Sequence, residues 1–256
     1  MSLRQDQLDD FQRRGFLVLA ELFDRNEISR LAAEADRLLI ERADLISPRN
    51  LRCRFQPHVT SGESLFEVFD PVCDISPVCE EFASDPRVST VLRDLLREPF
   101  LLFKDKLIYK PPGARGYELH QDIPANWPGF PKSFQTVLIA IDSMSVNNGC
   151  TVVYPGLHQR GFLAKPGTSG YPLPEEAVGD SEAVPLELAP GDVAIFGGLV
   201  PHRSAPNQSP GSRRALYLSF NAVSEGGDRR QQHYREFHDW MRQRQPGGLS
   251  AEVMFW

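Results

Sequence analysis

The feature that most constrains the fold of this 256-residue chain is a change of pattern at residue 99. Before it, apolar residues recur mainly at helical spacing, and after it short apolar runs separated by turn residues continue to about residue 222. Such runs predict β-strands. The strand candidates are residues 100–109, 135–141, 151–153, 184–188, 192–196 and 214–221. Irregularly spaced strands without intervening helices argue against a doubly wound parallel sheet and favour a double-sheet jelly roll.

The segments on either side of these strands are expected to form helices that pack outside the jelly roll. Asp24 is followed three residues later by Glu27, which is the pattern of a capping box, and helical spacing continues to about residue 43. Further elements are expected as helices at 5–14, 79–83, 88–96 and 228–244, a strand at 16–19, and an irregular loop and candidate lid at 44–65. The chain 1–256 is therefore expected to be one mainly β domain with flanking α-helices. Its parts are a helical segment 1–98, a jelly-roll core of about 99–222 and the C-terminal helix.

The composition sets limits on partners and location. The formal net charge of −6 gives no reason to expect a nucleic-acid partner, and no apolar run approaches the length of a membrane span. The N-terminal residues are polar and charged, unlike a secretory signal. The four cysteines form no CxxC pair, so a reduced, cytoplasmic protein with free thiols is expected, as a monomer or homodimer.

A candidate metal site begins with the triplet His120-Gln121-Asp122. On a strand, positions i and i+2 point to the same face, so the imidazole and the carboxylate would converge. His202, which follows a turn and an apolar strand, would add a second imidazole. Two histidines and one carboxylate with open coordination positions are the ligand set of non-haem Fe(II) oxygenases. The competing interpretation is a loop pair that hydrogen-bonds to the backbone.

Two residues near His202 suggest an anion site beside the metal. Arg213 lies eleven residues beyond His202 and opens the next predicted strand. Its planar guanidinium matches a carboxylate through two parallel hydrogen bonds. Ser204 shares a face with His202 if that segment is extended, and its hydroxyl could support the same anion. The competing interpretations are a solvated strand end for Arg213 and a turn residue for Ser204.

Three segments together resemble the phytanoyl-CoA dioxygenase family. They are HQD at 120–122, NNGCTVVYPGLH at 147–158 and PGDVAIFGGLVPHRSAPNQSPGSRRALYLSFN at 190–221. The resemblance runs from about residue 99 to 222 and implies a double-stranded β-helix, the jelly roll of cupins. It also implies dependence on Fe(II), 2-oxoglutarate and O₂, release of succinate and CO₂, and an in vitro benefit from ascorbate.

The resemblance also implies roles for individual residues. His120, Asp122 and His202 would bind iron, and Arg213 with Ser204 would bind the distal carboxylate of 2-oxoglutarate. Gln121 stands where the side chain in members often turns toward the cosubstrate or the substrate, and Lys106 where members often contact the cosubstrate. Leu138 stands where many members carry Trp. Related halogenases have Gly or Ala in place of the carboxylate, so the presence of Asp122 favours hydroxylation or another oxidation over halogenation.

The substrate is less constrained than the chemistry. The segments KDKL and KPPGARGYELHQD are similar to members that hydroxylate small aminoalkylphosphonates. The resemblance thus implies hydroxylation of an unactivated C–H bond in a small polar or anionic molecule, such as an aminoalkylphosphonate, an amino-acid derivative or a natural-product intermediate. Candidate substrate residues are Arg54, Asn126 and Trp127, while Lys104 and Lys110 are expected at the solvated surface.

Two other functions compete with this one. The first is a non-catalytic jelly-roll binding module, which has no need for an intact set of His120, Asp122, His202 and Arg213. The second is a cupin-type metal-dependent hydrolase or isomerase, which explains three ligands but not an arginine aimed at a second anchor point.

Overall fold

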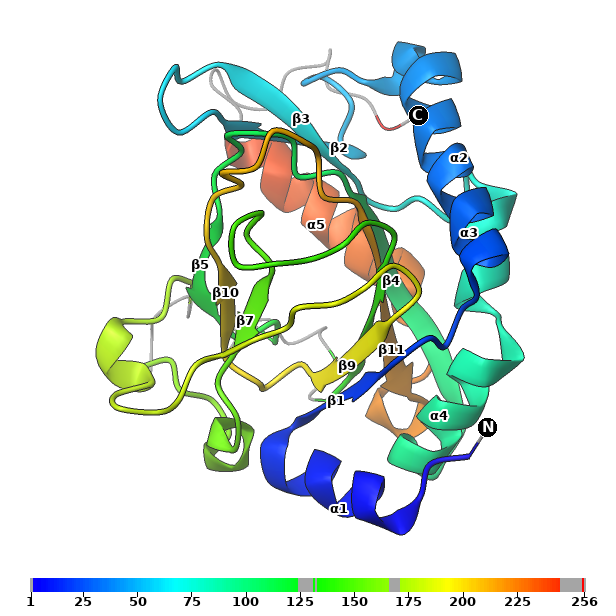
Figure 1. Ribbon diagram of the computed structural model, residues 1–256, viewed down its shortest axis with the longest axis vertical. Coiled ribbons are helices and arrows are strands. Elements are labelled where there is room, and N and C mark those ends of the chain that lie inside the picture. The colour runs from blue at the N-terminus through cyan, green and yellow to red at the C-terminus, as the bar shows by residue number, and fades with distance from the viewer. Residues whose placement is uncertain (1, 124–130, 132, 166–170, 245–254, 256) are drawn as a thin grey trace.

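The computed structural model describes residues 2–123, 131, 133–165, 171–244 and 255, and it confirms the expected jelly roll with flanking helices. Two antiparallel sheets face each other (Figure 1). The larger has the order β1 (Phe16–Leu19), β9 (Val193–Gly197), β6 (Gln135–Ala140), β11 (Ala215–Ala222), β4 (Phe100–Ile108), β3 (Ser64–Phe69) and β2 (Cys53–Pro57). The smaller has the order β5 (Tyr117–His120), β10 (His202–Ser204), β7 (Thr151–Val153) and β8 (Val184–Pro185).

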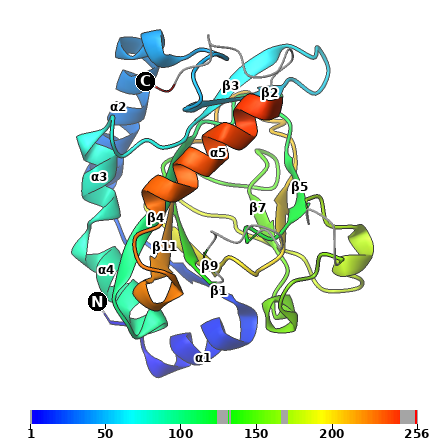
Figure 2. The same cartoon turned by 180° about the vertical axis from the view of Figure 1, so that it is seen from behind.

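Helices cover the outer side of the larger sheet (Figures 1 and 2). The α-helices are α1 (Gln5–Arg14), α2 (Arg25–Glu41), α3 (Pro77–Ala83), α4 (Pro86–Leu96) and α5 (Arg230–Arg244). Short 3₁₀ helices are η1 (Ala43–Leu45), η2 (Leu157–Arg160), η3 (Glu175–Ala177) and η4 (Val223–Glu225). The predicted capping box is present, because the Asp24 side chain accepts from the Glu27 amide while Glu27 accepts from the Asp24 amide. None of the described helices has the length and apolarity needed to span a membrane.

Strand alternation sorts the core into two clusters. On β6, Val137 and Ile139 face the cluster shared with the helices, whereas Leu138 and Ala140 face the space between the sheets. Cys150 belongs to the inner cluster, as expected for a buried strand start. The inner faces of β4, β6 and β11 are therefore the surfaces on which a site between the sheets is built.

The prediction for residues 44–65 is wrong. Instead of a purely irregular loop, this segment contains η1 and β2, and β2 pairs antiparallel with β3, another strand absent from the prediction. Its hydrogen-bond partners lie on another segment, so no local pattern announced it. The strand expected at 184–188 is also shorter, because β8 ends at Pro185, which has no N–H to donate to the sheet.

Helix α5 lies across the molecule beside β4 (Figure 2), close to its predicted position. The Tyr234 hydroxyl accepts from the Asp105 amide at 3.2 Å and donates to the buried Asp70 at 3.0 Å. Arg230 forms an ion pair with the side chain of Asp105. These contacts connect the C-terminal helix to the strand that carries Lys104 and Lys106.

Candidate metal centre

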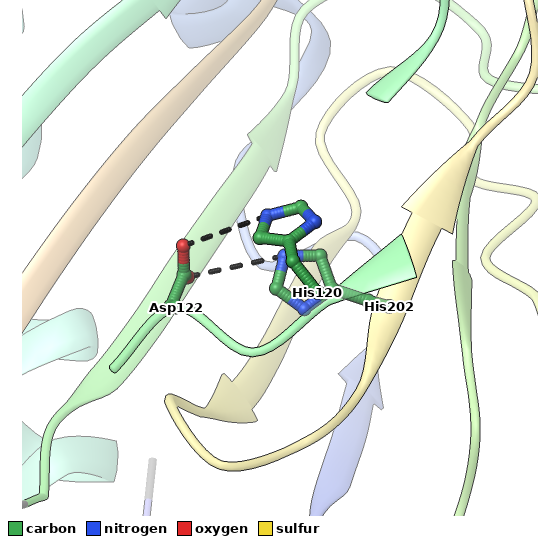
Figure 3. Close-up of side chains that lie close together, drawn as sticks. All are labelled: His120, Asp122 and His202. Atoms are coloured by element: carbon green, nitrogen blue, oxygen red, sulfur yellow. Dashed lines mark ion pairs between the residues drawn. The ribbon is translucent and has the colours of Figure 1, made fainter. Parts of the chain in front are cut away.

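Two paired strands of the smaller sheet bring the candidate ligands together. His202 of β10 lies opposite His120 of β5, and their ring centroids are 4.2 Å apart. Asp122 lies in the bend two residues beyond β5, so only the first member of the triplet is on a strand. The three side chains point toward one another (Figure 3). The bend, rather than the alternation of a strand, brings the carboxylate to the two imidazoles.

The geometry of this group suits one metal ion. Asp122 Oδ1 is 3.9 Å from His120 Nε2, and its Oδ2 is 4.0 Å from His202 Nε2. One ligand atom from each residue lies within 4.8 Å of the others. The Nδ1 atoms of His120 and His202 hydrogen-bond to the carbonyls of Glu118 and Val200, at 2.7 and 2.9 Å. Each Nδ1 therefore carries the proton, and each Nε2 presents a lone pair to the common point.

The protonation states also fit metal binding. Burial, reinforced by His202, lowers the pKa of His120 to about 3. Burial alone raises the pKa of Asp122, but the ammonium of Lys104, followed by the interactions with the two imidazoles, outweighs it and holds this pKa below its ordinary value. The carboxylate is therefore ionised and His120 is neutral near pH 7. Neutral imidazoles with one carboxylate are a donor set that suits Fe(II).

A single cavity extends from these ligands to a buried arginine. Arg213 is 2% exposed, so the solvated strand end considered for it is wrong. Its Nη2 donates to the Gly149 carbonyl at 2.9 Å, while its Nε and Nη1 have no hydrogen-bond partner among the described residues. Two enclosed N–H donors on one guanidinium fit a carboxylate. The pocket therefore has a metal-binding end and a carboxylate-binding end.

Hydroxyl groups surround the arginine end. Ser204 is on β10 with His202, as expected for an extended segment, and lines the cavity. Its Oγ accepts from the Lys110 ammonium at 2.9 Å and from the Tyr117 amide at 3.2 Å, which leaves its own proton to donate. Thr151 and Tyr217 also line the cavity, with their hydroxyls 3.0 Å apart.

The lysines predicted at the surface are buried. Lys104 is 8% exposed and lines the cavity, and Lys110 is fully buried. The Lys110 ammonium donates to Ser204 and to the carbonyls of Gly149 and Ala205. Buried lysines are rare because an uncompensated charge is costly, so both expectations fail through contacts with segments distant in sequence. Lys106 lines the cavity, as its predicted cosubstrate role requires.

Other predicted site residues lie elsewhere. The Gln121 amide donates to the carbonyls of Gly161 and Leu199 and accepts from Leu163, so it joins two loops instead of turning into the cavity. Arg54 is 3.6 Å from the Asp70 carboxylate, and its guanidinium stacks 4.7 Å from the centroid of the Phe237 ring, away from the lining residues. Asn126 and Trp127 lie outside the described residues.

Several lining residues were missed by the sequence prediction. Tyr217 and Ser219 follow Arg213 along β11 at alternate positions, so the alternation that placed Arg213 could also have found them. Thr136 on β6 lines the cavity too, and its hydroxyl donates to Asp122 Oδ2 at 3.3 Å. The ring of Tyr171 meets His120 edge-on, with the centroids 5.0 Å apart. No sequence pattern predicts this last contact.

The jelly roll, which is a double-stranded β-helix, and its His-Asp-His group define a class of metalloprotein. Its ligand set is of the type that binds non-haem iron. The chain belongs to the phytanoyl-CoA dioxygenase family, whose family model matches residues 11–215. This finding confirms the resemblance carried by the three segments, and the match extends into the helical part before them.

Two curated relatives have names that refer to phosphonates. Methylphosphonate hydroxylase of Gimesia maris is 40% identical over 142 residues, which are 56% of this chain and 53% of the relative. The 2-aminoethylphosphonate dioxygenase of the uncultured bacterium HF130_AEPn_1 is 30% identical over 177 residues, 68% of this chain and 66% of the relative. The chain thus spans just over half of the first relative and just under two thirds of the second.

Solved structures share the fold over most of the chain. EctD from S. alaskensis, crystallised with 2-oxoglutarate and 5-hydroxyectoine, is 26% identical with a TM-score of 0.72, covering 87% of this chain and 77% of that one. The epimerase SnoN, in complex with Fe³⁺, alpha ketoglutarate and nogalamycin RO, has a TM-score of 0.73 at 17% identity, covering 98% and 92%. The second match bears on the fold alone.

Proposed function

We propose that this protein is an Fe(II)- and 2-oxoglutarate-dependent dioxygenase that hydroxylates an unactivated C–H bond of a small polar metabolite. The observation that carries the proposal is the single cavity that joins three converging ligands to the buried Arg213. The names of the relatives and the ligands of EctD support the same chemistry. In such a reaction one oxygen atom of O₂ enters the substrate, the other enters succinate, and 2-oxoglutarate loses CO₂.

The residues of the cavity divide the work. His120, Asp122 and His202 would hold the iron, which when bound supplies O₂ activation. Arg213 would bind the distal carboxylate of 2-oxoglutarate through its Nε and Nη1 donors, with the Ser204 hydroxyl beside it. The protein's own contribution is to orient the cosubstrate and to exclude water from around it.

Lys106 and the substrate residues complete this proposal. Lys106 lies on the cavity wall, where it would contact the cosubstrate. The phosphonates named for two relatives are the first substrates to test, followed by amino-acid derivatives. Asn126 and Trp127 stay predictions for substrate contact. Arg54 is engaged by Asp70 outside the lining, which gives its predicted substrate role no support.

The competing functions fit the site less well. A binding module would not require two histidine tautomers aligned on one carboxylate. A cupin-type hydrolase or isomerase would leave the two buried donors of Arg213 without a purpose, at a cost of ~1–3 kcal/mol for each unsatisfied group. A 2-oxoglutarate carboxylate satisfies both donors.

The proposal extends to the location, the oligomeric state and the partners of the protein. The chain would act as one catalytic domain in the cytoplasm, as a monomer or homodimer, on a small molecule and without nucleic acid. The four cysteines are buried free thiols, as expected in a reducing compartment.

The test is turnover of 2-oxoglutarate by the purified protein with Fe(II), O₂ and ascorbate. We expect slow succinate formation without substrate and faster formation with methylphosphonate or 2-aminoethylphosphonate, both absent in His120→Ala. Calorimetry with Mn(II) in place of Fe(II) should show 2-oxoglutarate binding. Absence of both succinate formation and 2-oxoglutarate binding would overturn the proposal.

A further inference from the structure

The inner face of β4 places three side chains at successive levels of the cavity. Ile108 pairs with Ala215, Lys106 with Tyr217 and Lys104 with Ser219 on the neighbouring strand β11. Each step of two residues advances the level by about 7 Å. All three β4 side chains line the cavity. The positions of these residues on strand β4 therefore define a scale of successive levels along the length of the pocket.

The two ends of the pocket can be located on this scale. Arg213 lies two residues before Ala215, so it belongs to the Ile108 end of the scale. The metal end lies at the level of Ser219, because Ser219 pairs with Thr136 and the Thr136 hydroxyl bonds to Asp122. Lys106 is therefore between the two anchors of the cosubstrate.

Lys104 lies at the metal end, at the level of Ser219. Its Nζ is 3.9 Å from Asp122 Oδ1 and 5.2 Å from the centroid of the Phe134 ring. The hydroxyls of Thr136 and Ser219 are 3.1 Å apart and also line the cavity. A compact ammonium beside hydroxyl groups in an enclosed pocket is suited to an oxyanion.

The charges around the cavity favour a doubly charged guest. The cations in its lining are Lys104, Lys106, Arg203 and Arg213, and the carboxylate is Asp122. Arg203 is neutralised by Glu175 at 2.8 Å, so three cations face one carboxylate and two positive charges are in excess. The charges of Fe(II) and of dianionic 2-oxoglutarate cancel each other. The two excess positive charges of the lining are therefore available to the substrate.

Neighbouring acidic groups do not remove this excess. Asp70 lies 3.6 Å from the Arg54 guanidinium and also interacts with Lys106 and Lys104 of the lining. Glu67 accepts from the Tyr117 hydroxyl and interacts with Lys110, and also with Arg213 and Lys106 of the lining. Arg54 and Lys110, the basic residues beside these two carboxylates, lie outside the lining and equal the carboxylates in number.

We propose that Lys104 binds the phosphonate head group of the substrate, and that the oxidised carbon is one or two bonds from this group. The inference rests on the proposed function and adds the anchor and the position of oxidation. A phosphonate dianion matches the two excess charges, and its three oxygens can meet the ammonium and the nearby hydroxyls. Because Lys104 is 3.9 Å from a metal-binding oxygen, a head group held there brings the adjacent carbons to the metal.

The matched variants Lys104→Met and Lys106→Met test the anchor. Lys104→Met should raise the KM for 2-aminoethylphosphonate at least tenfold, while 2-oxoglutarate binding to the Mn(II) protein changes less than twofold. Lys106→Met should chiefly weaken 2-oxoglutarate binding, and Lys104→Arg should recover part of the substrate affinity. Thermal melts of each variant check that it folds. Equal substrate KM values in Lys104→Met and the parent protein, with normal 2-oxoglutarate binding, would overturn the inference but not the proposed function.

A substrate series tests the head group and the position of oxidation. Methyl-, ethyl-, propyl- and butylphosphonate should all be hydroxylated on the first or second carbon, as read by ³¹P NMR and mass spectrometry of the products. The carboxylate analogue 3-aminopropanoate should stimulate succinate release at least tenfold less than 2-aminoethylphosphonate. Oxidation that moves to the chain terminus as the chain lengthens, or an equal response to the carboxylate, would contradict the proposal.

Discussion

The two ends of the cavity are built in different ways. At the arginine end, Glu67 and Lys110 are fully buried and Arg213 is 2% exposed. At the metal end, the side chains of His120, Asp122 and His202 are 10–16% exposed. The first end is a closed network that holds one constant group. The second has to admit a metal, O₂ and a variable substrate, so it keeps access to solvent.

The closed end is held together by shared hydrogen bonds. The Gly149 carbonyl accepts from both Lys110 and Arg213, at 2.8 and 2.9 Å. Gly149 has a φ of +69°, and a Cβ there would lie 2.6 Å from the Lys110 ammonium, so only glycine allows this approach. The Tyr117 hydroxyl donates to Glu67 at 2.7 Å on the same side of the pocket. Such a network fixes the arginine before the cosubstrate arrives.

The largest expected effect is at the metal end. His120→Ala removes one of three ligands, so metal content and succinate formation should fall by more than the ~10–100-fold typical of losing a residue that only supports a ligand. Metal analysis and a succinate assay measure the two effects. His158→Ala is the control, since His158 bonds to the Gln12 carbonyl outside the cluster. Metal retention in His120→Ala would show that the ligand set is wrong.

Arg213→Ala should have the next largest effect, confined to the other end. Loss of two charge-assisted bonds worth about 1.5–3 kcal/mol each should raise the KM for 2-oxoglutarate by at least about 100-fold. Metal content should stay near the parent value. Arg213→Lys keeps the charge but loses the planar fork, and we expect it to recover only part of the affinity. Equal loss of metal and cosubstrate would show that the two ends are not separate.

Lys110 should link cosubstrate binding to pH. Burial, followed by the charge of Arg213, lowers the pKa of Lys110 to about 7, while the Glu67 and Cys150 side chains act in the opposite direction. The carboxylate of 2-oxoglutarate favours the charged lysine, so its affinity should fall as pH rises through about 7, by at most about tenfold per pH unit for one proton. Calorimetry from pH 6 to 9 should show this slope in the parent protein.

Lys110→Met is the matched variant for this effect. It should bind 2-oxoglutarate about tenfold more weakly at pH 6.5, because one buried charge beside Arg213 and its bond to Ser204 are lost. Its affinity should then be flat with pH over the same range. A slope that persists in the variant would assign the titration to another group.

The sequence predicted the metal end better than the closed end for a physical reason. His120, Asp122 and His202 occupy a short motif and a strand start, so local pattern sufficed for the metal end, whereas at the closed end it indicated only Arg213 and Ser204. The acceptors of Lys110 lie 39, 94 and 95 residues away, and only folding shows that they surround it. A lysine with no visible partner is expected at the surface, which is why its burial was missed.

The same contrast applies to the strands. The buried strands β4, β6, β9 and β11 were predicted because their apolar runs are continuous or regularly alternating. Strand β2 is an edge strand, and its burial pattern has no such period, so pairing with β3 alone defines it. Gln121 was misjudged for a related reason, since its partners are loop carbonyls from distant segments.

The smallest expected effect tests whether the metal end is supported as tightly as the closed end. Thr136→Val removes the 3.3 Å bond to Asp122 and keeps the shape of the side chain. The bond is long and Thr136 also meets Ser219, so metal affinity should fall only about three- to tenfold, at or below the low end for such supporting contacts. The 2-oxoglutarate affinity at saturating Mn(II) should be unchanged. Ser219→Ala, which leaves the Asp122 contact in place, is the control. A loss of metal affinity well above about tenfold would mean that the metal end is also preorganised by a network and that the contrast between the two ends is one of exposure alone.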